Sequence, residues 1–266
     1  MKLSFSTLGC PEWYWSDIVS AAKDLGFQGI EVRGVLNQIH IPRIKQFSEQ
    51  EYRETLAELA RLELYIPCFT SACELDVHAN HGAMMKEGKG YIDTAARMKV
   101  PYIRVLGDRE PAASGEVDVG LVKESVLELA EYAEGTDVTL LVETNGWFAD
   151  SERLAKLLQD TDRPNVAALW DIHHPYRFMH EPPKATVENL GGSIRHVHAK
   201  DSRMAGGKVK YMMMGMGDVP VAEAVEALEN AGYEGFYSLE WVKRWDLTLE
   251  APGIAFAQYV QYMRAL

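Results

Sequence analysis

Four residues that can bind a metal ion follow apolar, strand-like segments in the second half of the chain: Glu143, Asp171, His198 and Glu240. The segments are Leu140-Leu-Val-Glu143, Ala168-Leu-Trp-Asp171, Ile194-Arg-His-Val-His198 and Tyr237-Ser-Leu-Glu240. Their spacing is about one strand plus one helix, with a longer last interval, as in neighbouring strands of a parallel barrel. Three carboxylates and one imidazole form a mostly oxygen-rich site, which suits one Mn2+, Co2+, Mg2+ or Zn2+ ion.

The alternation of side chains along a strand allows the four residues to converge. In each strand the candidate ligand shares its face with the residue two positions earlier: Leu141, Leu169, His196 and Ser238. Each ligand can therefore point inward near the carboxyl end of its strand. Four inward polar groups without partners would be costly to bury, so we predict a metal centre in preference to a purely structural set.

Strand-like and helix-like segments alternate along the whole chain. Strands are expected at 2–8, 29–33, 65–70, 102–107, 139–145, 166–172, 195–200 and 236–241. Helices are expected at 16–25, 48–62, 81–98, 119–133, 151–159, 183–190, 221–231 and 249–264. This repeat predicts an α/β fold, a (β/α)8 TIM barrel, with residues 1–266 as a single domain. The longest irregular segments, 108–118, 146–151 and 201–220, each follow a strand, on the face where barrel enzymes carry their sites.

The composition of the chain disfavours several classes of protein. A formal net charge of −12 argues against a broad surface for nucleic acid or an anionic membrane, and favours a small diffusible ligand. The three cysteines lack CxxC spacing, which indicates buried thiols in a reducing compartment. No apolar run approaches the ~20 residues of a membrane span, and the first residues are too polar for a signal peptide. We therefore expect a cytoplasmic protein.

Short motifs surround the candidate ligands and extend to an earlier strand. They are Val142-Glu-Thr-Asn145, Trp170-Asp-Ile-His-His174, His196-Val-His-Ala-Lys-Asp201, Met216-Gly-Asp-Val-Pro220, Ser238-Leu-Glu240 and Gly29-Ile-Glu-Val-Arg33. These motifs resemble those of the xylose isomerase-like TIM barrel family of sugar isomerases, epimerases and dehydratases. The resemblance covers nearly the whole chain. That family shares its fold with endonuclease IV.

The resemblance to ketose 3-epimerases of this family implies a set of functional residues. The metal ligands would be Glu143, Asp171, His198 and Glu240. His174, three positions after the aspartate, and Arg203, shortly after the metal-binding histidine, would contact the substrate. Lys200 and Asp201 are similar to residues of many inosose dehydratases and sugar-phosphate isomerases, which makes Lys200 a further expected substrate contact.

The chain also departs from its relatives. Endonuclease IV looks like a three-zinc enzyme with additional ligands from earlier strands, where this chain has Phe69-Thr-Ser-Ala72 and Arg104-Val-Leu-Gly107. One metal ion is therefore expected, and DNA repair is disfavoured by the missing ligands and the acidic charge. The segment Thr144-Asn-Gly-Trp-Phe148 lacks a second acidic residue that some ketose epimerases carry, so the resemblance does not fix one epimerase activity.

Three further sets of residues each have two interpretations. Glu31 and Arg33 share a face of one strand, where they would form an internal ion pair or contact the substrate, and Arg104 has the same alternatives. Trp15, in an aromatic segment after the first strand, would stack on a sugar or cover the barrel without touching one. His173 and His196 would each orient a metal-binding carboxylate or simply pack in the core.

The sequence thus predicts a metal-dependent isomerase or epimerase of a sugar or sugar phosphate. The metal would hold a carbonyl and its neighbouring hydroxyl, while Glu143 and Glu240 move a carbon-bound proton through a metal-bound enediolate. If His174 or Lys200 protonates a departing hydroxyl instead, the protein is a dehydratase of an inosose or related keto-polyol. A non-catalytic carbohydrate-binding barrel is the alternative from another class.

The expected partners follow from the same observations. They are a small carbohydrate substrate, no nucleic acid and no membrane. The aromatic final helix, Phe256-Ala-Gln-Tyr-Val-Gln-Tyr-Met263, carries more apolar side chains than a fully solvated helix needs. Such a surface predicts a homodimer or homotetramer.

Overall fold

The computed structural model describes residues 1–113 and 115–266. In these residues eight strands run parallel in one sheet: β1 (Lys2–Ser6), β2 (Gly29–Glu31), β3 (Cys68–Glu74), β4 (Tyr102–Leu106), β5 (Thr139–Glu143), β6 (Val166–Asp171), β7 (Ile194–Ala199) and β10 (Phe236–Leu239). Their order is β2-β1-β10-β7-β6-β5-β4-β3, and bridges from Gly29 to Tyr65 and from Val32 to Phe69 join the two edges. The sheet therefore curls into a nearly closed barrel, which confirms the predicted (β/α)8 fold.

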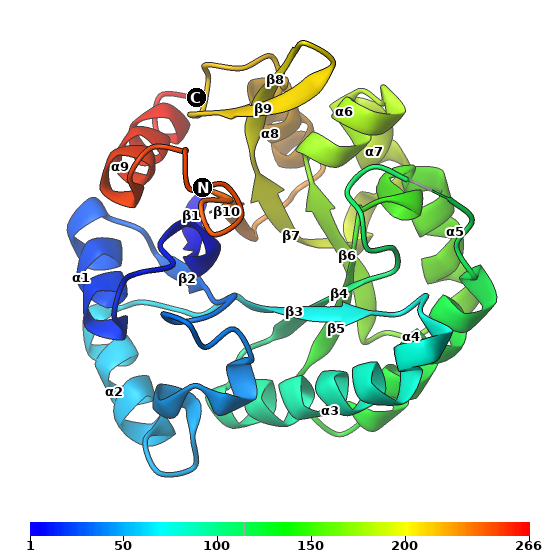
Figure 1. The fold of residues 1–266 in the computed structure, drawn as a ribbon, viewed down its shortest axis with the longest axis horizontal. Helices are drawn as coiled ribbons and strands as arrows, with labels where there is room; N and C mark the ends of the chain where they lie inside the picture. The colour runs from blue at the N-terminus through cyan, green and yellow to red at the C-terminus, as the bar shows by residue number, and fades with distance from the viewer. Residues whose placement is uncertain (114) are drawn as a thin grey trace.

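Helices surround the strands on the outside (Figure 1). They are α1 (Trp15–Leu25), α2 (Tyr52–Leu62), α3 (His81–Met98), α4 (Val119–Tyr132), α5 (Ser151–Thr161), α6 (His173–Met179), α7 (Pro183–Leu190), α8 (Val221–Asn230) and α9 (Pro252–Met263). Short 3-10 helices lie in the connections: η1 (Thr7–Gly9), η2 (Ile41–Arg43), η3 (Lys45–Phe47), η4 (His78–Asn80), η5 (Trp147–Ala149) and η6 (Gly191–Ser193).

The strands are apolar on both faces, and each face packs into a different core. In β5, Leu140 and Val142 belong to the large core between strands and helices, whereas Leu141 belongs to a separate cluster inside the barrel. That inner cluster consists of Cys68, Leu141, Ala167 and Leu169. Burial on both faces is typical of parallel strands covered by helices. Because Glu143 shares the face of Leu141, its carboxylate points into the barrel.

The expectation of an irregular segment at 201–220 is wrong in part. Strands β8 (Asp201–Ala205) and β9 (Lys208–Met212) form an antiparallel hairpin at the rim of the barrel (Figure 1). Gly206 and Gly207 make its turn with φ angles of 58° and 76°, the left-handed conformation that a two-residue type I′ turn requires. A Gly-Gly dipeptide between two strand-like segments indicates a hairpin. The periodicity of strands and helices in the barrel does not indicate this hairpin.

Helix α9 packs its apolar face onto the barrel. Phe256 and Tyr259 are completely buried, and the Phe256 ring stacks on Phe5 with centroids 4.3 Å apart. The apolar side chains that suggested self-association are therefore mostly used within the chain. The argument from this helix is wrong, and a homodimer or homotetramer stays a prediction without it.

The prediction of buried thiols is confirmed in the described residues. The three cysteines are free and buried, and burial raises the pKa of the Cys73 thiol to about 12, so this thiol is poorly nucleophilic. No helix in the described part of the chain is long and apolar enough to cross a membrane.

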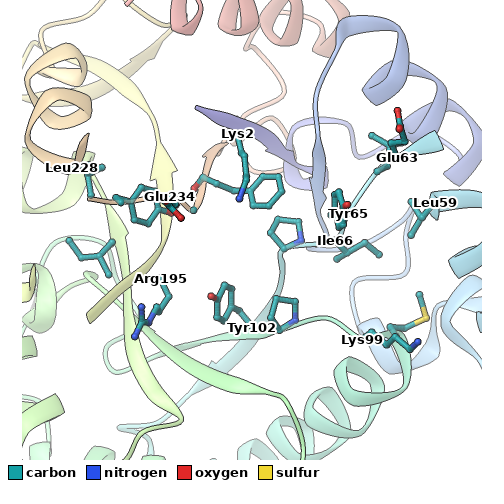
Figure 2. A pocket seen from close by; sticks show the side chains of 18 of the residues that line it. Lys2, Leu59, Glu63, Tyr65, Ile66, Lys99, Tyr102, Arg195, Leu228 and Glu234 are labelled. Carbon is teal, nitrogen blue, oxygen red and sulfur yellow. Dashed lines mark hydrogen bonds between the residues drawn. The ribbon is translucent and has the colours of Figure 1, made fainter. Parts of the chain in front are cut away.

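A large cavity of about 810 Å³ opens at the amino-terminal ends of the strands (Figure 2). Lys2, Tyr102, Arg195 and Phe236, which stand at or next to the starts of their strands, are among the residues that line it. Parallel strands direct the candidate metal ligands to the opposite end of the barrel. The cavity is therefore separate from the candidate metal centre.

Candidate metal centre

Glu143, Asp171, His198 and Glu240 meet at the carboxyl ends of their strands, and we refer to them as the four-residue cluster. Each offers one ligand atom, and these atoms all lie within 4.8 Å of one another. Glu143 and Asp171 are the last residues of β5 and β6, His198 is the fifth residue of β7, and Glu240 directly follows β10. The strands are neighbours in the order β10-β7-β6-β5, so consecutive barrel units bring the four side chains together.

The His198 ring has a different environment at each nitrogen. Its Nδ1 lies 3.3 Å from Glu143 Oε1, 3.6 Å from Glu240 Oε1 and 4.0 Å from Asp171 Oδ2. Its Nε2 lies 3.1 Å from both carboxylate oxygens of Glu31. The Nδ1 atom is therefore the one that faces the three carboxylates and could bind an ion with them.

Two buried cations hold the cluster. Arg104 Nε lies 3.1 Å from Glu143 Oε2. Lys200 Nζ lies 2.7 Å from Asp171 Oδ2 and donates a hydrogen bond to Glu240 Oε2. Arg104, which the sequence leaves as an ion-pair partner or a substrate contact, is thus an ion-pair partner here.

The net charge of this region favours the binding of a divalent cation. Arg104 and Lys200 contact the carboxylates of the four-residue cluster directly, at distances of 4.0 Å or less. His198 connects these carboxylates to Glu31 through contacts in the same range. With neutral imidazoles, four carboxylates and two cations leave two negative charges in a buried region. A divalent ion would cancel them, and the oxygen-rich donor set suits Mn2+, Co2+, Mg2+ or Zn2+. The residues present therefore fit such an ion.

The protonation states follow from burial and these charges. Burial raises the pKa of Glu143, but Arg104 and His198 outweigh it and lower this pKa to about 2. Burial lowers the pKa of His198, but the carboxylates of Glu31 and Glu240 raise it well above its usual value. Asp171 and Glu240 likewise raise the pKa of Lys200, against the effect of burial. Glu143 is therefore ionised at neutral pH, and the His198 imidazole holds a proton that an ion would have to displace.

The loop after β6 brings His174 beside the cluster. Asp171 Oδ1 accepts hydrogen bonds from the backbone N–H groups of His173 and His174, at 2.8 and 3.3 Å, which fixes the start of α6. His174 Nδ1 lies 3.0 Å from the Thr144 carbonyl oxygen, so this nitrogen carries the proton and donates it. The other nitrogen, Nε2, lies 3.3 Å from Lys200 Nζ and 3.5 Å from Asp171 Oδ2. His174 and Lys200 are therefore both at the cluster.

The structure does not bring every expected substrate-binding residue to the cluster. Trp15 is buried in α1, where its Nε1 donates to Glu58 and its ring packs on Phe47. Arg203 is exposed on the hairpin, opposite Lys210. Both positions are set by the folding of the connections between strands, and strand periodicity does not predict this folding.

Glu31 lies on the Nε2 side of His198, away from the Nδ1 atom that faces the other three carboxylates. It is completely buried and bonded to His196 and His198, so an accessible substrate contact does not match its position. The alternative ion pair with Arg33 is not formed either, because Arg33 Nη1 donates to the Ile39 carbonyl oxygen at 3.3 Å. Strand alternation indicates that the Glu31 and His196 side chains point into the barrel. It does not indicate which inward side chains form hydrogen bonds with one another across the barrel.

Comparisons with known proteins agree with this architecture. A family model described as a xylose isomerase-like TIM barrel matches residues 19–265. The chain is 25% identical over 257 residues to a fructoselysine 3-epimerase of Shigella flexneri, covering 92% of this chain and 90% of that protein.

Solved structures share the fold at lower identity. A probable 3-DHS dehydratase from Bacillus anthracis has a TM-score of 0.81 at 20% identity, covering 99% of both chains. The IOLI protein with a bound zinc atom has a TM-score of 0.79 at 17% identity, covering 100% of this chain and 97% of the other. Since the family model spans nearly the whole sequence, the chain belongs to the xylose isomerase-like TIM barrel family.

Proposed function

We propose that the protein is a divalent-metal-dependent epimerase or isomerase that acts on a ketose-type sugar or sugar phosphate. The observation that carries the proposal is the convergence of three carboxylates and one imidazole within 4.8 Å. The similarity to fructoselysine 3-epimerases over 92% of the chain supports a sugar derivative as the substrate. The bound ion would supply Lewis acidity toward a carbonyl oxygen and the neighbouring hydroxyl.

The carboxylates Glu143 and Glu240 are suited to move the proton. They belong to barrel units separated by β6 and β7, and their Oε1 atoms lie 3.3 and 3.6 Å from His198 Nδ1. A hydroxyketone between them would have one carboxylate on each side. One would remove the carbon-bound proton to form an enediolate, and the other would return a proton to the same or the neighbouring carbon. Arg104 keeps Glu143 ionised and able to accept that proton.

A dehydratase is the second candidate, and the position of Lys200 favours it. Its buried ammonium group touches Asp171 and Glu240 and lies 3.3 Å from the unprotonated His174 Nε2, so one proton donor, with an imidazole that can accept its proton, adjoins the cluster. After a carboxylate has removed the carbon-bound proton, Lys200 could protonate a departing hydroxyl, either directly or through His174 Nε2. The product would then be an unsaturated ketone and water, which an epimerase does not form.

A substrate panel distinguishes these reactions. Protein loaded with Mn2+ or Co2+ is incubated in deuterium oxide with free and phosphorylated ketoses, fructoselysine and inososes, and the products are followed by NMR. We expect an epimer or isomer that carries deuterium at the reacting carbon. A product that has lost water identifies the dehydratase. Binding of these compounds with neither exchange nor turnover would contradict both, and would favour a non-catalytic carbohydrate-binding barrel.

Metal binding should tighten as the pH rises. Glu31 and Glu240 raise the pKa of His198 in the metal-free protein, so the ion must displace a proton from this imidazole. Below that pKa, the Kd for Mn2+ should fall by about tenfold per pH unit. Calorimetric titration in buffers of different ionisation enthalpy measures the released proton. A Kd that is constant between about pH 6 and 8 would contradict this protonation state.

A further inference from the structure

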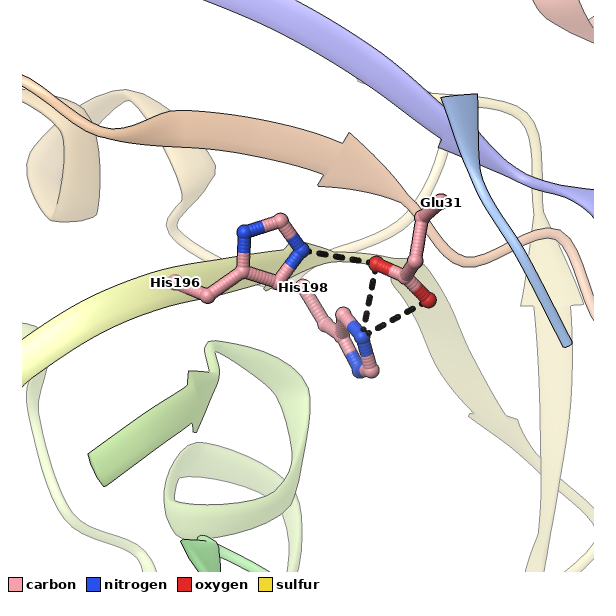
Figure 3. A group of neighbouring side chains, drawn as sticks. All are labelled: Glu31, His196 and His198. Atoms are coloured by element: carbon pink, nitrogen blue, oxygen red, sulfur yellow. Dashed lines mark hydrogen bonds and ion pairs between the residues drawn. The ribbon is translucent and has the colours of Figure 1, made fainter. Parts of the chain in front are cut away.

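Glu31 connects two histidines inside the barrel (Figure 3). Its Oε2 lies 2.7 Å from His196 Nε2 and 3.1 Å from His198 Nε2, and its Oε1 is also 3.1 Å from His198 Nε2. All three side chains have an exposed fraction of 0%. Glu31 comes from β2 and both histidines from β7, so β1 and β10 separate them in the sheet.

Hydrogen-bond chemistry fixes the protons in this group. An ionised carboxylate only accepts hydrogen bonds, so each histidine must donate its Nε2–H to Glu31. Once an ion has displaced the second proton of His198, the neutral imidazole keeps a single N–H group, at Nε2, and Nδ1 has a free lone pair. That lone pair faces the Glu143, Asp171 and Glu240 carboxylates, where the ion would bind.

We propose that Glu31 is a positioning residue that holds His198 in the tautomer able to bind the metal. His196 has a supporting role, because its hydrogen bond gives the buried Glu31 carboxylate a second donor. The inference rests on the proposed metal centre and adds to it the reason why Nδ1, and not Nε2, is the ligand atom. Hydrogen bonds of this kind behind a metal-bound histidine orient the ring and raise its affinity for the ion.

A second metal ion held by Glu31, His196 and His198 is the competing interpretation. The three residues offer ligand atoms close together. However, the 2.7 and 3.1 Å separations are those of direct hydrogen bonds. An ion between the same atoms would also need His198 to use both nitrogens. The metal stoichiometry of the wild-type protein distinguishes the two, because the positioning role predicts one ion per chain.

The Glu31→Gln substitution tests the role with little change in shape. Both Glu31 oxygens are 3.1 Å from His198 Nε2, so either orientation of the amide brings its NH2 group against the Nε2–H. The remaining amide oxygen can still accept from the Nε2–H, but the negative charge and one of the two acceptor atoms are lost, so the preference for the metal-binding tautomer is weakened. The Kd for Mn2+, measured by calorimetry, should rise by about 10- to 100-fold. Glu181→Gln is the matched control, because Glu181 also accepts backbone and side-chain hydrogen bonds but lies outside the cluster.

Three further measurements separate positioning from general stability. Thermal unfolding of the metal-free variants reports stability alone, and the visible spectrum of bound Co2+ should change in Glu31→Gln. His196→Phe, which keeps a ring but removes the donor, should weaken Mn2+ binding by a smaller factor. If Glu31→Gln does not fold, nitrogen-15 NMR of the zinc-loaded wild type still identifies the tautomer, and we expect Nε2–H for His198.

Each contrary result has a distinct meaning. An unchanged Kd for Mn2+ in Glu31→Gln with only lower metal-free stability would overturn the positioning role, as would an Nδ1–H tautomer. Two ions per wild-type chain, one of them lost in Glu31→Gln, would overturn it in favour of the second metal site. A wild-type protein that binds no divalent ion would overturn the metal centre itself, and the inference with it.

Discussion

Replacing His198 by alanine is expected to remove the metal ion and the activity together. His198 contributes the only nitrogen of the four-residue cluster, and Ala offers no ligand atom. The substitution also leaves the fully buried Glu31 without one of its two hydrogen-bond donors. We expect no stoichiometric Mn2+ or Co2+ in the purified variant and no detectable turnover of the identified substrate. Elemental analysis and the deuterium-exchange assay measure the two losses.

The exposed His78 provides the matched control for this variant. It pairs with Asp118 outside the cluster, so His78→Ala should keep both the ion and the activity. Chelation of the wild-type protein should reproduce the effect of His198→Ala, and added Mn2+ or Co2+ should reverse it. Full activity in a His198→Ala protein that holds no metal would contradict the metal-dependent mechanism.

Glu143→Gln and Glu240→Gln should lose turnover while retaining much of the metal affinity. Glutamine keeps the size of the side chain and one oxygen that can contact an ion, but it cannot accept a proton from carbon. General base catalysis contributes typically 10²–10⁴-fold, so we expect kcat to fall by about this factor in each variant. The Kd for Mn2+ should rise by a smaller factor than kcat falls. Metal titration and deuterium exchange on the same samples provide both numbers.

An exposed glutamate serves as the control for these variants. Glu188 forms a surface ion pair with Lys184, and Glu188→Gln should change neither metal binding nor exchange. The two cluster variants also test the division of roles. If both exchange the substrate proton at the wild-type rate, neither carboxylate transfers it. Loss of exchange in one variant alone would assign the first proton removal to that carboxylate.

Local sequence patterns determined the fold and the meeting of the four candidate ligands. The repeat of strands and helices specifies the barrel because each unit must bury an apolar strand and an apolar helix face. Alternation then places Glu143 on the face of Leu141, inside the barrel. The four side chains meet in the structure, while their roles as metal ligands stay predictions.

Only the tertiary structure decided which inward side chains are partners. Glu31 and His196 are 165 residues apart and meet across the barrel, so no local period links them. The same holds for Arg104 and Lys200, whose cations offset the buried carboxylates of Glu143, Asp171 and Glu240. The positions of Trp15 and Arg203 depend on α1 and the hairpin. Periodicity reports which face of an element is buried, but the pairing of polar groups there depends on barrel closure and on long-range electrostatics.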